Sequence, residues 1–169
     1  VSVASVIPGM VSDEAAKFLF ALCYMQQLVG DVVEIGSWQG RSTSFLARAV
    51  KESGNGNLYA IDHFQGNVGK ERHYVVNDSN LSDLREGFER NMEALDLEKY
   101  VNLLEMRSEQ AAQHLTERNV RIRLLFIDGD HTKEGVQRDV FLFFPLLLPN
   151  AIVVFDDFSQ GFPGLVEAV

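Results

Sequence analysis

Short runs of β-branched and apolar residues alternate with helical patterns along this chain, and each of the five runs carries an acidic residue at or near its end. The run from 122 to 128 is almost continuously apolar, as expected for a central parallel strand that helices cover on both faces. Strands that alternate with helices need crossover connections, which are right-handed in parallel sheets. The pattern therefore predicts an α/β fold with a doubly wound, mostly parallel, Rossmann-like sheet. The five strands are expected at 32–36, 57–62, 101–106, 122–128 and 151–157.

Helices are expected between these strands, with one more ahead of the first strand. Ser12 can cap that first helix, which we expect to end at Gly30. Spacings of three and four residues predict that its buried face consists of Ala15, Phe18, Leu22, Met25 and Val29. A second helix is expected at 41–50, and a third has Leu81, Leu84, Phe88 and Met92 on one face. A fourth follows a cap at Ser108 and buries Ala112 and Leu115. A fifth is expected at 136–147, where Pro145 shortens the helix. The chain is thus expected to form a single domain, 1–169, with a helical segment at 1–30 and the Rossmann-like core at 31–169.

Composition and charge narrow the classes of function. With 169 residues, 46% of them hydrophobic, the chain can build one α/β core. A net charge of −9 and dispersed basic residues disfavour a nucleic-acid backbone and favour a small or cationic ligand. Cys23 is the only cysteine, which fits a reducing compartment. No apolar run approaches the ~20 residues of a membrane span, and residues 1–10 do not resemble a signal peptide, so we expect a soluble, cytoplasmic protein with no membrane partner.

Ligands of open parallel sheets bind beyond the carboxyl ends of the strands. There, Gly36 and Gly40 frame a turn where the backbone can approach a ligand closely, because neither residue carries a Cβ atom. Asp62 follows the second strand and is placed to accept hydrogen bonds from both hydroxyls of a ribose. The segment from Glu34 to Asp62 therefore indicates an adenosine site. Taken alone, the glycine turn is equally typical of an ordinary strand-to-helix connection, and Trp38 can either flank a cofactor or pack in the core.

A second set of acids follows the fourth and fifth strands. If these strands are neighbours, their ends lie about 5 Å apart, so Asp128, Asp156 and Asp157 can converge on one hard cation, by default magnesium. His131 lies three residues past Asp128 and could remove a hydroxyl proton near neutral pH. The alternative is that Asp128 or Asp130 merely organises the turn at 129. Arg41 can meet a carboxylate or lie on a solvated helix face, and His63, His73 and His114 have no ligand-like spacing.

The segment 33–43, VEIGSWQGRST, resembles the first motif of class I methyltransferases, which use S-adenosylmethionine. More narrowly, it is similar to the branch that contains macrolide-sugar O-methyltransferases and cephalosporin-hydroxylase-like proteins. Segments 126–131, FIDGDH, and 154–157, VFDD, match later motifs of that branch, and 7–10, IPGM, resembles its entry segment. The resemblance covers nearly the whole chain.

The resemblance implies roles for individual residues. The cofactor-binding set would be Glu34, Gly36, Ser37, Trp38, Gly40, Ser42, Asp62, His63, Ser108, Glu109 and Asp128. Within it, Glu34, Gly36 and Gly40 would line the methionine end of the cofactor. Asp62 would bind its ribose, and Ser108 with Glu109 would lie near its adenine. Asp128, Asp156 and Asp157 would carry magnesium, and His131, with Asp128, would be catalytic.

Two departures from the family pattern stand out. Asn150 replaces a glycine before the fifth strand and can serve because asparagine tolerates left-handed backbone geometry. The family also continues into a C-terminal β-hairpin that this sequence lacks. We therefore expect a trimmed chain or pairing supplied by another subunit, with an exposed strand edge.

The sequence thus predicts a transferase, an S-adenosylmethionine-dependent enzyme that O-methylates a small hydroxylated molecule with the help of magnesium. An NAD-dependent oxidoreductase is one alternative, although the segment 36–40 lacks the three-glycine fingerprint of that class. A non-catalytic adenosine- or metal-binding module is the other. Residues 63–80 are a candidate lid that, with C-terminal segments, would select the acceptor. The sequence is also compatible with a homo-oligomer.

Overall fold

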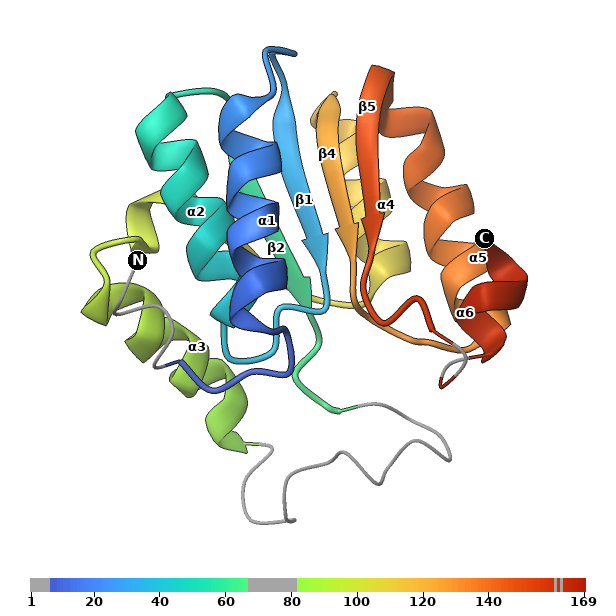
Figure 1. Cartoon of the computed structure of the whole chain (residues 1–169), viewed down its shortest axis with the longest axis horizontal. Coiled ribbons are helices and arrows are strands. Elements are labelled where there is room, and N and C mark those ends of the chain that lie inside the picture. Colours follow the sequence, from blue (N-terminus) through green and yellow to red (C-terminus); the bar gives the residue numbers. More distant parts are fainter. Residues whose placement is uncertain (1–6, 67–81, 160, 162) are drawn as a thin grey trace.

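The computed structural model describes residues 7–66, 82–159, 161 and 163–169, which contain one five-stranded sheet of order β3-β2-β1-β4-β5. All neighbouring strands pair in parallel, so their carboxyl ends lie along one edge of the sheet (Figure 1). The strands are β1 (Asp31–Ile35), β2 (Leu58–Asp62), β3 (Val101–Glu105), β4 (Ile122–Ile127) and β5 (Leu147–Phe155). The predicted doubly wound parallel sheet is confirmed, and β4 and β5 are neighbours, which is the condition that the predicted metal site required.

Helices cover both faces of the sheet and bury two apolar cores. One face carries α1 (Asp13–Met25), α2 (Arg41–Ser53) and α3 (Ser82–Ala94), and the other carries α4 (Ser108–Glu117) and α5 (Lys133–Phe143). The short helices are η3 (Glu98–Tyr100), η4 (Phe144–Leu146) and α6 (Pro163–Ala168). Every side chain of β4 is buried, as its apolar run predicted. Within the described ranges, no helix is both long and apolar enough to cross a membrane.

Proline and asparagine act near β5 as the sequence predicted. α5 ends at Phe143 and Pro145 lies in the following short helix η4, because proline cannot donate to the helical ladder. Asn150 adopts a φ of 67°, the left-handed geometry expected of it. β5 begins four residues earlier than predicted and forms one edge of the described sheet. The predicted lid at 63–80 and the position of Leu81 fall largely on 67–81, outside the described residues.

The predicted buried face of the first helix is wrong for three of its five residues, while Ala15 and Leu22 pack partly buried against the core. α1 begins as expected, with the Ser12 hydroxyl accepting a hydrogen bond from the Ala15 amide, but it ends at Met25, short of Gly30. Ala16, Leu19 and Cys23 are the buried residues, whereas Phe18 is 59% and Met25 is 71% exposed. Val29, beyond the helix, is 80% exposed. α1 packs against α2, and the small side chains of Ala16 and Cys23 on its buried face let the two helices approach closely. Packing between the helices, rather than the spacing of the large apolar residues, therefore decided which face is buried.

Arg123 is a fully buried cation at a bulge in β4. The pairing register of β4 shifts around it, on both the β1 and the β5 side. Its guanidinium donates to the carbonyl oxygens of Cys23, Gly30 and Asn55 at 2.8, 3.0 and 3.1 Å, and to the Gln26 side chain at 3.1 Å. These acceptors lie at the end of α1, before β1 and before β2. A single side chain therefore ties three chain segments to the centre of the sheet.

Replacing Arg123 by alanine is expected to lower the free energy of unfolding by about 3 kcal/mol or more, because several buried carbonyl oxygens lose a charged donor. Urea denaturation followed by circular dichroism measures the change. Arg121→Ala is the matched control, because Arg121 is exposed two residues earlier, and it should change stability by less than about 0.5 kcal/mol. An Arg123→Ala protein as stable as the parent would show that this cluster contributes little.

Candidate active site

Backbone hydrogen bonds continue past the ends of the strands and bring the predicted site segments together. The amides of Gly36, Asp128 and Asp156 each donate to a carbonyl at the end of the neighbouring strand, at 2.9, 2.8 and 3.0 Å. These bonds join the ends of β2, β1, β4 and β5 in that order. Residues that are far apart in the sequence thus lie along one continuous edge.

Glycine is required in the turn after β1 by the fold itself. Gly36 has a φ of +89°, and a Cβ atom there would lie 2.0 Å from the carbonyl oxygen of Asp128. Gly40 caps α2 with a φ of +87°, and a Cβ atom there would lie 2.7 Å from the Met92 methyl group. The close approach of a ligand to these glycines stays a prediction, and the close neighbours that the structure shows are parts of this chain.

Glu34 is a fully buried carboxyl group beneath this turn. Its Oε2 accepts a hydrogen bond from the Thr43 hydroxyl, a partner that the sequence analysis missed. Burial raises its pKa to about 8, Asp128 and Asp62 add to the rise, and the Ser42 and Thr43 hydroxyls counter it. Among the described residues, Glu34 Oε1 and the buried Ser37 hydroxyl have no hydrogen-bond partner of ordinary geometry. Two buried polar atoms at this turn therefore have unused hydrogen-bonding capacity.

Asp62 joins the turn after β1 to the turn after β2. Its two carboxylate oxygens accept the backbone amides of Trp38 at 2.8 Å and Phe64 at 2.7 Å. Trp38 has a φ of 43° and Phe64 a φ of 53°, so the carboxylate supports two left-handed residues. Each oxygen keeps a further lone pair that a hydroxyl group could use.

The segment after β4 pairs an acid with a histidine. His131 Nε2 lies 3.4 Å from Asp128 Oδ1, and the two side chains are only 11% and 18% exposed. Burial raises the pKa of Asp128 to about 7, the nearby carboxylates of Asp156 and Asp157 add to the rise, and the hydrogen bond with His131 opposes it. Asp130 Oδ1 accepts the amide of Thr132 at 3.0 Å, so of the two acids Asp130 is the one that organises the turn.

A preformed metal site is not found among the described residues, which contain no group of three or more His, Cys, Asp or Glu side chains placed to hold an ion. Asp156 has a raised pKa, through burial and then through the charge of Asp157. Asp157 itself is exposed, with a φ of 53°. The three aspartates are therefore close enough to repel one another without forming a closed set of ligands.

Ser108 and Glu109 lie at the start of α4, but Ser108 does not cap the helix as predicted. The N-cap is Arg107, and the Ser108 hydroxyl donates to Asp139 of α5 at 2.6 Å. Glu109 pairs with Arg138 of α5 at 3.1 Å. The sequence analysis missed Asp139, although an acid at apolar helical spacing from Val136 and Phe143 could have signalled it.

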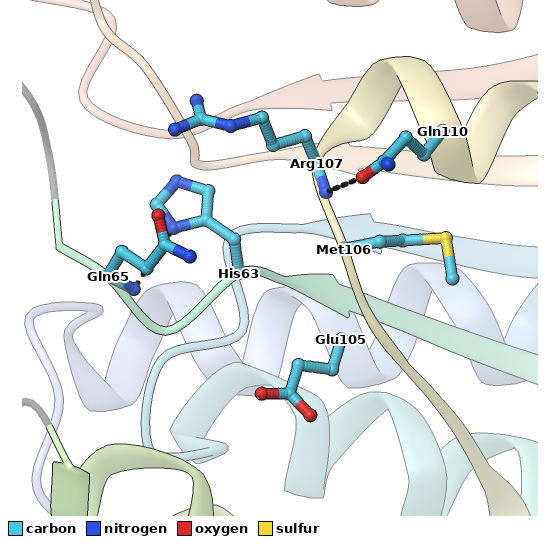
Figure 2. Close-up of a pocket in the computed structure, with 6 residues that line it drawn as sticks. All are labelled: His63, Gln65, Glu105, Met106, Arg107 and Gln110. Carbon is cyan, nitrogen blue, oxygen red and sulfur yellow. Dashed lines mark hydrogen bonds between the residues drawn. The ribbon is translucent and has the colours of Figure 1, made fainter.

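A cavity of about 300 Å³ opens beyond β2 and β3. Figure 2 shows the Arg107 side chain reaching over His63, with Gln65 beside them. Of its lining residues only His63 was predicted for the site. The lining consists of His63, Gln65, Glu105, Met106, Arg107 and Gln110.

Comparison with known proteins decides the family. A family model described as a methyltransferase domain matches residues 33–158. The chain belongs to this methyltransferase family. The prediction of a class I, S-adenosylmethionine-dependent methyltransferase is thereby confirmed.

Solved structures show the same fold at low sequence identity. CalS11, a TDP-rhamnose 3'-O-methyltransferase of calicheamicin biosynthesis, has a TM-score of 0.66 and 19% identity, over 93% of this chain and 70% of that one. An O-methyltransferase from Bacillus cereus, solved with SAH, has a TM-score of 0.69 and 20% identity, over 98% and 71%. TomG from Streptomyces achromogenes, an O-methyltransferase of tomaymycin synthesis solved with SAM, has a TM-score of 0.69 and 20% identity, over 94% and 67%.

The buried acids predict that the free methyltransferase domain is more stable near pH 5 than near pH 8. The pKa of Glu34 is about 8 when folded, against 4.5 for the ordinary group. Between these values unfolding releases a proton, so the free energy of unfolding falls as pH rises and levels off above about pH 8. The expected fall is on the order of a few kcal/mol, measured by urea denaturation at several pH values.

Glu34→Gln should reduce this pH dependence because it removes one of the buried titrating groups, while Asp128 and Asp139 keep their share. Glu93→Gln, at an exposed position on α3, is the control and should leave the dependence as it is. A Glu34→Gln protein with the pH dependence of the parent would count against the raised pKa.

Proposed function

We propose that this domain transfers a methyl group from S-adenosylmethionine to a hydroxyl oxygen of a small molecule, such as a sugar, a polyol or another natural product. The observation that carries the proposal is the edge formed by the ends of β2, β1 and β4. There backbone hydrogen bonds join the strand ends that carry the 36–40 turn and the Asp128–His131 pair, and the Asp62 carboxylate accepts the Trp38 amide.

The residues at the β1 and β2 ends fit the cofactor. The unpartnered Glu34 Oε1 and Ser37 hydroxyl are buried acceptors and donors of the kind that the polar methionine end needs. Asp62 retains lone pairs for ribose hydroxyls, and the α2 amides after Gly40 are free of a side-chain cap. We assign Trp38, Ser42 and His63 to the same site, with Ser108 and Glu109 on the adenine side.

His131 and Asp128 are the proposed acid–base pair. Bound S-adenosylmethionine would supply an electrophilic methyl group on a sulfonium. As the acceptor oxygen forms its bond to the methyl carbon and the carbon–sulfur bond breaks, His131 takes the hydroxyl proton, leaving S-adenosylhomocysteine and the methyl ether. Asp128, 3.4 Å away, orients the imidazole and stabilises its protonated form.

Magnesium assistance is a separate proposal. Asp128, Asp156 and Asp157 would hold the ion, and their mutual repulsion supports this because a dication would relieve it. They do not form a closed ligand set as they stand. The proposed proton transfer therefore rests on His131 and Asp128 alone.

The acceptor class rests on charge and on the relatives. A net charge of −9 favours neutral or cationic acceptors over polyanions. CalS11 is named for a sugar nucleotide and TomG for tomaymycin synthesis, and both are O-methyltransferases. A hydroxylated sugar or natural product is the class that these observations favour.

Cofactor binding is tested by titration calorimetry with S-adenosylhomocysteine. Asp62→Asn should weaken binding by about tenfold or more, because the substituted side chain loses a carboxylate acceptor. Asp31→Asn is the matched control, since Asp31 also accepts a loop amide, that of Asn57 at 2.8 Å, but at the opposite edge of the sheet. Absent binding by the folded parent protein, or equal affinity in both variants, would contradict the proposal.

Proton transfer is tested by following labelled methyl transfer to a panel of hydroxylated sugars and polyols. His131→Gln should lower kcat by about 10²- to 10⁴-fold and leave the affinity for S-adenosylhomocysteine within about twofold. His114→Gln on α4 should behave as the parent protein.

The same assay separates the remaining alternatives. Stimulation by magnesium and its loss in Asp157→Asn would support the metal proposal, and equal rates with EDTA would refute it. Cofactor binding without transfer to any acceptor would favour a non-catalytic binding module.

A further inference from the structure

The Asp139 side chain of α5 lies between two segments of the proposed site, the start of α4 and the segment 128–131. Asp139 is 1% exposed, and its Oδ1 accepts the Ser108 hydroxyl at 2.6 Å. A Cβ atom on Gly129 would lie 3.7 Å from Asp139 Oδ2, so only the space of a missing side chain separates the second oxygen from the backbone directly after Asp128. Asp139 thus binds the start of α4 and lies beside the segment that leads to His131.

A second contact joins the same two segments at the surface. The Arg138 Nε atom lies 3.1 Å from Glu109 of α4, and its Nη2 atom lies 3.8 Å from Asp130. The Arg138 side chain is 42% exposed, so solvent weakens both pairs. The buried contact through Asp139 is therefore the stiffer link.

Burying Asp139 costs free energy that an apolar residue would not. Burial raises its pKa to about 6, opposed by the Ser108 hydroxyl and Arg138, while Glu109 and Asp130 add to the rise. An apolar side chain of similar size would pack here without desolvating a charge. Stability alone does not account for an acid at this position.

We propose that Asp139 is a positioning residue that fixes the start of α4 relative to the segment 128–131. The inference rests on the proposed function, in which the adenine side begins at Ser108 and proton transfer occurs at His131. A shift between these segments would move the methyl donor relative to the base, and such misplacement lowers the rate of the chemical step more than it lowers binding.

The test compares Asp139→Leu with Asp139→Asn at saturating S-adenosylmethionine. The leucine variant removes the link and should lower kcat by about tenfold or more, with affinity for S-adenosylhomocysteine changed by less than about threefold and with equal or greater stability. Asparagine can still accept the Ser108 hydroxyl and should restore kcat to within about threefold of the parent. Asp96→Asn is the control, because Asp96 is exposed and its φ of 54° suits asparagine.

Ser108→Ala should reproduce the loss in kcat, and combining it with Asp139→Leu should cause no further loss, because both changes break one contact. If Asp139→Leu does not fold, Ser108→Ala alone still decides. A folded Asp139→Leu or Ser108→Ala protein with parental kcat would overturn the proposal. A double variant whose loss in kcat equals the product of the two single losses would also overturn it.

A readout without turnover separates this inference from the proposed function. Hydrogen exchange of the amides at 108–111 and 128–132 should accelerate in Asp139→Leu even without cofactor, because the two segments lose their common anchor. An inactive parent protein with this response would refute only the proposed function. Unchanged exchange in both segments would refute the positioning role.

Discussion

The site depends on the parallel backbone ladder continuing past the ends of the strands. The amides of Gly36, Asp128 and Asp156 extend the ladder by one bond each, which fixes where the following turns begin. Gly36 makes this possible, because any Cβ atom there would collide with the carbonyl oxygen of Asp128. The edge is therefore held by main-chain geometry, and the chemical side chains are added to a scaffold that already exists.

This scaffold lets the protein bury acids that water would otherwise stabilise. Glu34, Asp128 and Asp139 all have raised pKa values, and in each case burial is the largest cause. The free-energy cost of burying these acids is offset by the stability of two apolar cores and of the buried Arg123 cluster. Functional sites commonly show such a concentration of perturbed acids, and here Glu34 and Asp128 lie at the ends of two neighbouring strands.

Sequence patterns predicted the local structure correctly where a single residue type or a neighbour in the sequence determines it. The apolar run of β4, the Ser12 cap, the stop at Pro145 and the left-handed Asn150 all followed from short-range chemistry. The patterns gave wrong predictions where tertiary packing determines which side chains are buried and which partner a hydroxyl group binds. α1 turned its small residues inward and left Phe18 and Met25 exposed, and Ser108 turned from the helix cap to Asp139.

By itself, the sequence determined the alternation of strands and helices, the acids at the strand ends and the family, because these depend on residue type and order along the chain. Only the tertiary structure decided which atoms meet. Thr43 binds Glu34, Trp38 binds Asp62, and Arg123 binds Cys23, and these partners lie between 9 and 100 positions apart in the sequence. The bond from Phe64 to Asp62 is the local exception. Such pairings are set by strand register and helix docking, which composition and periodicity do not encode.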